Sequence, residues 1–206
     1  MPVAPVQRRS KETYTNILTA AGRLLEREGV AQITVQKVAE AAGVDARLVR
    51  YYFDDLEGLM AVVADYAVSR WAAGFREMLA GHEDPREAIA GAYRVLWRRL
   101  TRPDPAARRQ ALVIQEIRLG AARNEGLRPL PRRAREEVEA AWVELLEEAS
   151  SRYEYAVHPR VLARMLYASW DGVSGDYLTT GDAARASEAA EGFIKALSAM
   201  ISPRSS

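Results

Sequence analysis

The chain is 206 residues long, which is enough to bury a hydrophobic core without help from disulfide bonds or metal ions. Its 29 basic and 28 acidic residues give a net charge of +1, and 49% of the residues are hydrophobic, so the composition excludes a disordered chain and a histone-like basic protein. The absence of cysteine excludes a thiolate zinc site and a cysteine nucleophile.

Membrane spans and secretion signals are not predicted. The sequence contains no run of 18 apolar residues, so we expect no helix that crosses a membrane. Arg8 and Arg9 lie near the start, but no apolar stretch follows them, so we expect no secretory signal. We therefore expect a cytoplasmic protein with no membrane partner.

Apolar residues recur at spacings of three and four along most of the chain, which is the pattern of amphipathic helices. The first such segment covers residues 11–28 and is followed by Gly29, a residue type that commonly ends helices. Further segments carry the pattern at 59–66, 89–97, 138–146, 162–170 and 190–197. No stretch shows sustained alternation with β-branched residues, so we expect no strands. The sequence predicts an all-α protein of about nine helices, with three short ones before residue 54.

A helix-turn-helix motif is predicted between Ile33 and Phe53. Thr34 is suited to cap the first helix, and Asp45 is suited to cap the second. Gly43 supplies the positive φ that a tight turn between them requires. Two short helices joined in this way place the second helix in the major groove of DNA.

The second helix of this motif, residues 46–52, carries long polar side chains. Arginine contacts guanine edges or phosphates, and tyrosine hydroxyls commonly reach phosphates. The candidates are Arg47, Arg50, Tyr51 and Tyr52. A helical pair with a glycine turn also occurs in proteins that never bind DNA. The spacing alone therefore leaves open a helical dimeric interaction or ligand-binding protein without operator binding.

The placement of apolar and small residues over the first 65 residues adds a second line of evidence. These residues are Ile17, Leu18, Ala20, Ala21, Leu24, Gly29, Thr34, Val38, Ala39, Ala42, Gly43, Val44, Tyr52, Phe53, Glu57, Gly58 and Leu59. In this arrangement the chain resembles the N-terminal domain of the TetR family of transcriptional regulators. The resemblance implies a DNA-binding head of three helices, a C-terminal helical domain that binds a small ligand and dimerises, and a repressor that the ligand releases from its operator.

The resemblance also implies a set of DNA-contacting residues. The contacts that it implies are Thr34, Arg47, Arg50, Tyr51 and Tyr52. Lys37, in the first helix of the motif, is a further predicted contact. The chain departs from the family at two of its positions, with Arg50 where the family usually has tyrosine and Leu56 where it usually has lysine. Arg8 and Arg9, just before the first predicted helix, are candidates to replace the missing phosphate contact.

The predicted DNA-binding domain, residues 1–54, is only weakly positive. Residues 8–53 contain eight basic and five acidic residues, a net charge of +3. Such a surface binds nonspecific DNA weakly. We therefore expect specific binding to need two heads of a homodimer on a double-stranded palindromic operator.

The larger domain, residues 55–206, is expected to bind ligand and to dimerise. By the layout of the family, its last two helices, at about 160–179 and 183–201, form the interface with a second subunit. Small residues there allow close helix approach, and large apolar residues supply buried area. The interface candidates are Gly172, Gly175, Phe193, Leu197 and Met200. Alternatively, these residues pack the core of one subunit.

The expected ligand site consists of aromatic residues on inner helix faces and one carboxylate. The candidates are Tyr93, Trp97, Glu116, Trp142, Tyr167 and Trp170. Aromatic walls favour an apolar or aromatic small-molecule effector, although such stripes are also found in ordinary cores. Residues 94–135 contain twelve arginines and three acidic residues. An anionic ligand is one explanation; ion pairing with the glutamates of 136–148 is the interpretation that we prefer.

Enzymatic chemistry is not predicted. His82 and His158 both lie beside helix breaks, and no second ligand cluster accompanies either of them. No glycine-rich phosphate loop follows a strand, and no Ser-His-Asp arrangement can be placed. We therefore expect no catalytic residue, no metal and no cofactor.

Overall fold

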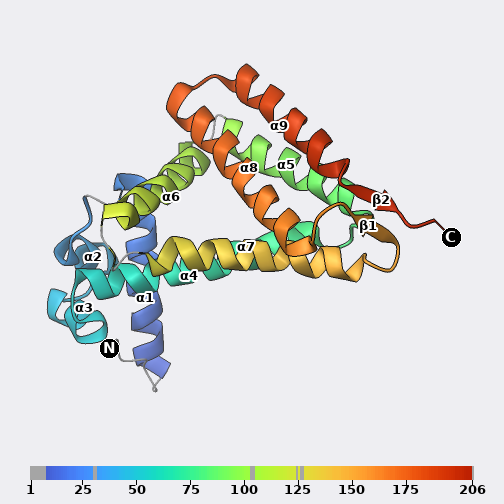
Figure 1. Ribbon diagram of the computed structural model, residues 1–206. Helices are drawn as coiled ribbons and strands as arrows, with labels where there is room; N and C mark the ends of the chain where they lie inside the picture. The colour runs from blue at the N-terminus through green and yellow to red at the C-terminus, as the bar shows by residue number, and fades with distance from the viewer. Residues whose placement is uncertain (1–7, 30–31, 103–104, 124, 126–127, 206) are drawn as a thin grey trace. The chain divides into compact units, whose positions relative to one another are not determined.

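A computed structural model describes residues 8–29, 32–102, 105–123, 125 and 128–205 (Figure 1). The elements in chain order are α1 (Arg8–Glu28), α2 (Val35–Ala42), α3 (Ala46–Phe53), α4 (Leu56–Leu79), α5 (Pro85–Thr101), α6 (Pro105–Arg123), α7 (Pro129–Glu148), β1 (Tyr153–Tyr155), α8 (Pro159–Thr180), α9 (Ala183–Ser198) and β2 (Ile201–Pro203). The predicted all-α class is confirmed, and the expectation of no strands is wrong at β1 and β2.

The chain packs into two compact units. The first, which we name the head unit, contains residues up to 70 together with 109–131, and the second, the ligand unit, contains 71–108 together with 132–206. The larger part of α4, up to residue 70, and most of α6 therefore pack with the first three helices. The domain boundary expected after residue 54 stays a prediction.

The head unit has its own hydrophobic core. The apolar stripe of α1 buries Ile17 and Ala21 completely, and α3 contributes Val49 and Phe53, which are also fully buried. Helices α2, α4 and α6 complete this core with Val38, Ala39, Leu59, Val63 and Val113. Within α1, α3 and α4 these positions lie four residues apart, which is the helical spacing that the sequence pattern showed.

Capping residues fix the ends of the two short helices. The Thr34 side chain accepts a hydrogen bond from the backbone N–H of Lys37, and Asp45 accepts one from that of Arg47. Gly43 ends α2 in the left-handed region at φ +65°, a conformation in which a side chain is disfavoured. The predicted caps and turn are confirmed, and they set the direction in which α3 leaves α2.

The core of the ligand unit forms between α5, α7, α8 and α9. Ile89, Leu146 and Leu162 have no exposed surface, and Leu166 is nearly as buried. Helices α8 and α9 lie side by side (Figure 1) and are joined at Gly181, which has a φ of +73°. The predicted final helix was too long at its C-terminal end, because α9 stops at Ser198.

Strands β1 and β2 form an antiparallel pair that joins the segment after α7 to the end of the chain. Tyr153 pairs with Pro203, and Tyr155 pairs with Ile201. Ile201 is buried, whereas Ser202 is exposed. Three-residue strands are too short to produce a recognisable alternation in sequence, which explains why the pattern did not predict them.

Within the described ranges, no helix is both long and apolar enough to cross a membrane.

Candidate DNA-binding surface and ligand cavity

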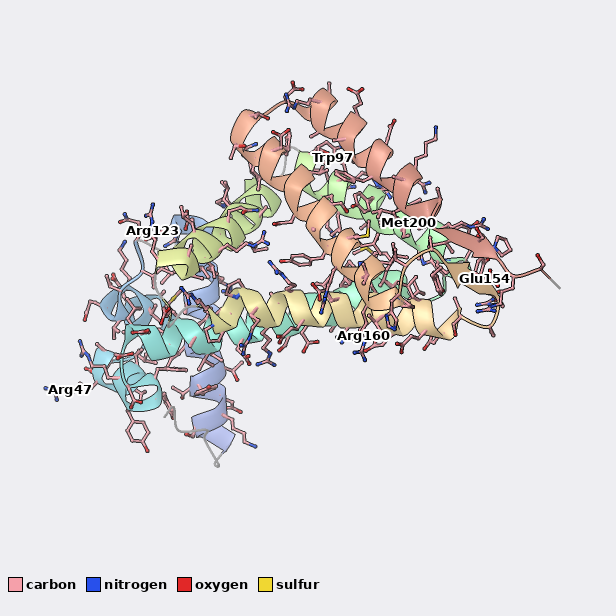
Figure 2. The ribbon with its side chains drawn as sticks, viewed as in Figure 1. Arg47, Trp97, Arg123, Glu154, Arg160 and Met200 are labelled. Atoms are coloured by element: carbon pink, nitrogen blue, oxygen red, sulfur yellow. The ribbon has the colours of Figure 1, made fainter. Side chains whose placement is uncertain are left out.

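Helix α3 divides its side chains between the solvent and the head core. Arg47, Arg50 and Tyr51 are exposed, and Tyr51 keeps 64% of its surface accessible. Figure 2 shows Arg47 reaching away from its helix. Among the described residues, neither arginine has an ion-pair partner. The exposed face of α3 therefore presents two guanidinium groups and one phenol to the solvent.

Tyr52 has a different position from the one predicted. Only 5% of it is exposed, and its hydroxyl forms a 2.7 Å hydrogen bond with the Ser10 hydroxyl of α1. Its ring packs edge-on against Tyr14 at 5.8 Å. Tyr52 shares the inner face of α3 with Val49 because the two are three residues apart. The expectation of a DNA contact at Tyr52 is corrected: this residue joins α1 to α3 inside the head unit.

The two α2 candidates lie in different environments. Thr34 is exposed at the start of the helix, where its side chain serves as the cap. The Lys37 ammonium donates a 2.8 Å hydrogen bond to the Glu28 carboxylate at the end of α1. Hydrogen bonds from Lys37 and Arg27 lower the pKa of Glu28. Sequence reasoning missed this ion pair, because its partners belong to different helices.

The remaining head positions also differ from expectation. Arg8 and Arg9 were expected before the first helix, but they form the first turn of α1, and their side chains lie outside what the structure describes. No Gly or Pro separates them from the predicted helix, so the helix continues back to Arg8. Leu56 is half-buried and packs against the head core at the start of α4, where the family usually has lysine.

A small apolar cavity lies in the ligand unit, with a volume of about 30 Å³. Its walls come from α4, α5, α7 and α8, and the lining residues are Phe75, Ala92, Tyr93, Leu96, Val138, Trp142, Leu166, Tyr167 and Trp170. The structure thus brings together four of the six predicted ligand residues. Phe75 was missed because nothing in the local pattern of α4 distinguishes this position from an ordinary core residue.

The other two predicted ligand residues lie elsewhere. Trp97, labelled in Figure 2, packs edge-on against Tyr177 at 5.2 Å and does not line the cavity. Glu116 belongs to α6 in the head unit, where its carboxylate lies beside Gly29. The choice of Glu116 for the cavity is therefore corrected: the helical pattern did not reveal that α6 packs with the head.

Tyr93 is the most perturbed ionisable group of the cavity wall. Its hydroxyl is hydrogen-bonded to that of Ser169, and burial raises the pKa of Tyr93 to about 12, with that hydrogen bond acting in the opposite direction. Ser169 in turn donates to the Leu166 carbonyl at 3.0 Å. Sequence reasoning missed Ser169, because a serine on an apolar helix face gives no signal of its buried partner.

Several glutamates of helix α7 pair with arginines from outside the arginine-rich segment. Arg76 of α4 contacts Glu137 and Glu144 at 3.1 and 3.2 Å. Glu139 lies 3.6 Å from an arginine of α8, Arg164. Within the segment itself, Arg132 does pair with a glutamate of α7, Glu136, at 3.6 Å. The pair of Arg132 with Glu136 fits the preferred explanation of the arginine excess, whereas Arg76 and Arg164 show that the α7 glutamates also pair with other arginines.

The predicted interface residues are divided between surface and core. Gly172 is exposed on α8, and Phe193 keeps 41% of its surface accessible on α9, while Gly175 is partly buried. Leu197 is almost fully buried in the ligand-unit core, and Met200, labelled in Figure 2, packs against that core. For Leu197 the alternative of core packing within one subunit is the one that the structure supports.

Two family models match the sequence over the regions just described. The bacterial regulatory proteins of the tetR family match residues 17–63, which include the helix-turn-helix. The tetracyclin repressor-like C-terminal domain matches residues 83–201, more than half of the chain. The chain belongs to the TetR family. It is a ligand-responsive DNA-binding transcriptional regulator.

Solved structures of TetR-family proteins have the same fold. E. coli NemR in its reduced form has a TM-score of 0.74 at 16% identity, covering 94% of this chain and 100% of that chain. A TetR regulator from Haloarcula marismortui has a TM-score of 0.70 at 20% identity, over 93% and 99%. The multidrug binding protein EbrR, complexed with proflavin, has a TM-score of 0.66 at 28% identity, over 90% and 99%. No curated protein sequence matches this TetR-family chain.

Proposed function

We propose that this TetR-family protein is a repressor that binds a palindromic operator as a homodimer and is released by an apolar or aromatic effector. The observation that carries the DNA-binding part is the exposed trio of Arg47, Arg50 and Tyr51. These side chains project from a short helix whose other face is anchored in the head core by Val49 and Phe53. An anchored helix with free guanidinium groups suits the major groove, where arginine pairs with guanine.

Phosphate contacts would come from the edges of this surface. The Tyr51 hydroxyl and the start of α2 at Thr34 are exposed, and the N-terminus of a helix attracts anions. Lys37 is held by Glu28, so it contributes less positive charge than a free lysine. With this weak charge, tight binding requires two heads on one DNA molecule.

The proposed dimer forms through α8 and α9. Phe193 and Val161 are large apolar side chains that remain 41% and 43% exposed in the single chain. Gly172 lies on the accessible side of α8, where the lack of a side chain permits close approach of a second subunit. Phe193 is the apolar anchor of this proposed interface.

Helix α4 links the proposed ligand site to the DNA-binding residues through one continuous backbone. Leu59 near its start is fully buried in the head core, and Phe75 near its end lines the cavity. An effector that repositions Phe75 would change the orientation of α4 and hence the spacing of two recognition helices across a dimer. The proflavin complex of EbrR supports a planar aromatic effector; proflavin is a cation, so the charge that this chain prefers is a separate question.

The DNA-binding proposal is tested with two variants that remove the same charge. Arg47→Ala removes an exposed arginine from α3, and Arg160→Ala removes an exposed arginine from α8 (Figure 2). The probe is the intergenic DNA beside the gene, titrated in gel-shift assays. A lost base contact costs about 1–3 kcal/mol, so Arg47→Ala should weaken binding by about 5–150-fold, while Arg160→Ala should change it little.

Equal affinities of the two variants would contradict the assignment of α3 as the recognition helix. Tyr52→Phe provides a second control, because it removes only the hydroxyl that bonds to Ser10. This variant should retain operator affinity once its folding has been verified by circular dichroism. If the folded wild-type protein binds no DNA from either side of its gene, the operator does not lie beside the gene.

A further inference from the structure

The walls of the ligand cavity are almost entirely aromatic and aliphatic. Five of the nine lining residues are aromatic, namely Phe75, Tyr93, Trp142, Tyr167 and Trp170, and the other four are aliphatic. None of the nine is an acid, a lysine, an arginine or a histidine. A charged group that entered such a cavity would lose its hydration without gaining an ionic partner from the walls.

The one buried hydroxyl pair at the cavity is internally satisfied. The Ser169 hydroxyl donates to the Leu166 carbonyl, so in its hydrogen bond with Tyr93 the phenol is the donor. The Tyr93 proton is therefore already engaged within the protein. A ligand that needs a phenol donor would have to break this bond, whereas an apolar ligand leaves it intact.

Charged residues next to the cavity walls are also engaged. Val138 of the wall is flanked by Glu137 and Glu139, which lie within 3.1 Å of Arg76 and 3.6 Å of Arg164, respectively. The Arg135 guanidinium lies 5.2 Å from the ring centre of Tyr167. A cation already placed on a ring disfavours a second cation on that ring. The carboxylates nearest the cavity are therefore already paired with arginines, and one wall ring, Tyr167, already has a guanidinium beside it. Neither feature favours the binding of a cationic ligand.

The size of the cavity favours a flat ligand. A volume of about 30 Å³ is far below the several hundred Å³ typical of a site for an organic ligand, so any such ligand must move wall rings apart. Two edge-to-face contacts close the space: Phe75 on Trp142 and Tyr93 on Trp170, each with ring centres 5.7 Å apart. A planar aromatic molecule placed between such rings replaces the contacts that it breaks with similar ones.

We propose that this cavity selects an uncharged, planar aromatic compound and rejects the same skeleton when it carries a charge of either sign. The proposal rests on the proposed function, in which this cavity is the effector site. It assigns to this chain a selectivity based on ligand charge.

Three probes built on the same tricyclic acridine ring system test the charge selectivity. Acridine is uncharged at a pH of about 8, proflavin is a cation, and acridine-9-carboxylate is an anion. Their dissociation constants for the full-length protein are measured by tryptophan fluorescence quenching and calorimetry. We expect acridine to bind at least about ten-fold more tightly than either charged probe, because only charged groups lose hydration without compensation. Tighter or equal binding of proflavin or the carboxylate would overturn the proposal, as would binding of none.

A negative charge introduced into the cavity wall should reverse the order of the acridine and proflavin affinities. Leu96→Glu places a carboxylate in the lining, and proflavin should then bind more tightly than acridine, while Leu96→Gln should keep the wild-type order. If Leu96→Glu keeps the wild-type order while folded, the probes bind elsewhere and the proposal fails.

A second pair of variants tests the site without adding charge. Trp170→Phe trims the wall, whereas Trp97→Phe removes an indole from a position that does not line the cavity. Acridine affinity should fall only in Trp170→Phe, and equal affinities would overturn the assignment. Operator binding is measured separately, in the gel-shift assay with Arg47→Ala. The protein can bind its operator even if none of the acridine probes binds, so failure of the DNA-binding proposal and failure of the charge selectivity are distinguishable.

Discussion

At the scale of single residues, two adjacent tyrosines of α3 have opposite roles. Tyr51 is 64% exposed, whereas Tyr52 is 5% exposed and hydrogen-bonded to Ser10. One step along a helix turns the side chain by about 100°, so neighbours in sequence face different surroundings. A family motif marks core and contact positions alike, which is why the resemblance assigned DNA contact to both. Only the packing of α1 on α3 separates them.

Tyr93 makes stability depend on pH in the alkaline range. Burial raises its pKa to about 12, above the ordinary value of 10.0 for a phenol in the unfolded chain. Its contribution is therefore complete below a pH of about 10 and is lost as the pH rises through about 12. We expect the free energy of unfolding to fall by about 2–3 kcal/mol over this window. Tyr93→Phe should show a smaller fall in urea titrations.

Tyr51→Phe is the matched control for this prediction, because Tyr51 is exposed and its removal should leave the alkaline loss of stability unchanged. The pKa values of Tyr14 and Tyr155 are also raised by burial, so part of the loss should persist in Tyr93→Phe. Identical pH profiles for the wild type and Tyr93→Phe would show that Tyr93 ionises normally.

At the scale of elements, the sequence was most informative where a local residue choice determines a local geometry. The caps at Thr34 and Asp45 and the turn at Gly43 were predicted because each depends only on nearby backbone groups. The beginnings of α8 and α9 were also close to prediction, since Pro and Asp start signals are local. Strands β1 and β2 were missed because their pairing joins residues about fifty positions apart.

The turn between α2 and α3 gives a prediction at this scale. A methyl group at Gly43 would meet no atom within 4 Å, so the cost of Gly43→Ala comes from φ +65° alone. We expect a loss of about 1 kcal/mol in the free energy of unfolding. Gly22→Ala is the control: this position also has space, but it lies inside α1, so the substitution should stabilise by about 0.5–1 kcal/mol. Equal effects in urea denaturation would contradict this explanation.

At the scale of the whole molecule, helical periodicity identified which face of each helix is buried. It did not identify which other helices pack against that face. The aromatic stripes of α5, α7 and α8 place Tyr93, Trp142 and Trp170 in the cavity wall, and the contact of these residues with a ligand stays a prediction. Glu116 was misplaced because an amphipathic pattern on α6 fits either core equally well. The chain forms two separate cores from alternating segments. This division depends on tertiary packing, which the spacing of apolar residues does not specify.

The proposed dimer is tested at the same scale. Phe193→Asp places a charge on the exposed anchor of α9, and we expect sedimentation to show a monomer at concentrations where the wild type is dimeric. Operator affinity should fall by more than about ten-fold, because each head would bind alone. Leu119→Asp, which alters a 57% exposed apolar residue of α6, should remain dimeric. A dimeric Phe193→Asp variant would place the interface elsewhere.

The pairing of β1 with β2 has a practical consequence for handling the protein. It closes the chain into a loop that begins near Tyr153, passes through α8 and α9, and returns at Pro203. Arg204 stabilises this strand pair with two hydrogen bonds. Its backbone N–H donates to the Arg152 carbonyl at 2.8 Å, and its side chain donates to the Ser150 carbonyl at 2.9 Å. A purification tag placed after Ser206 leaves the β1–β2 pair and the Arg204 hydrogen bonds intact. A truncation at Met200 removes both, together with the buried Ile201, and frees the end of α9 to fray.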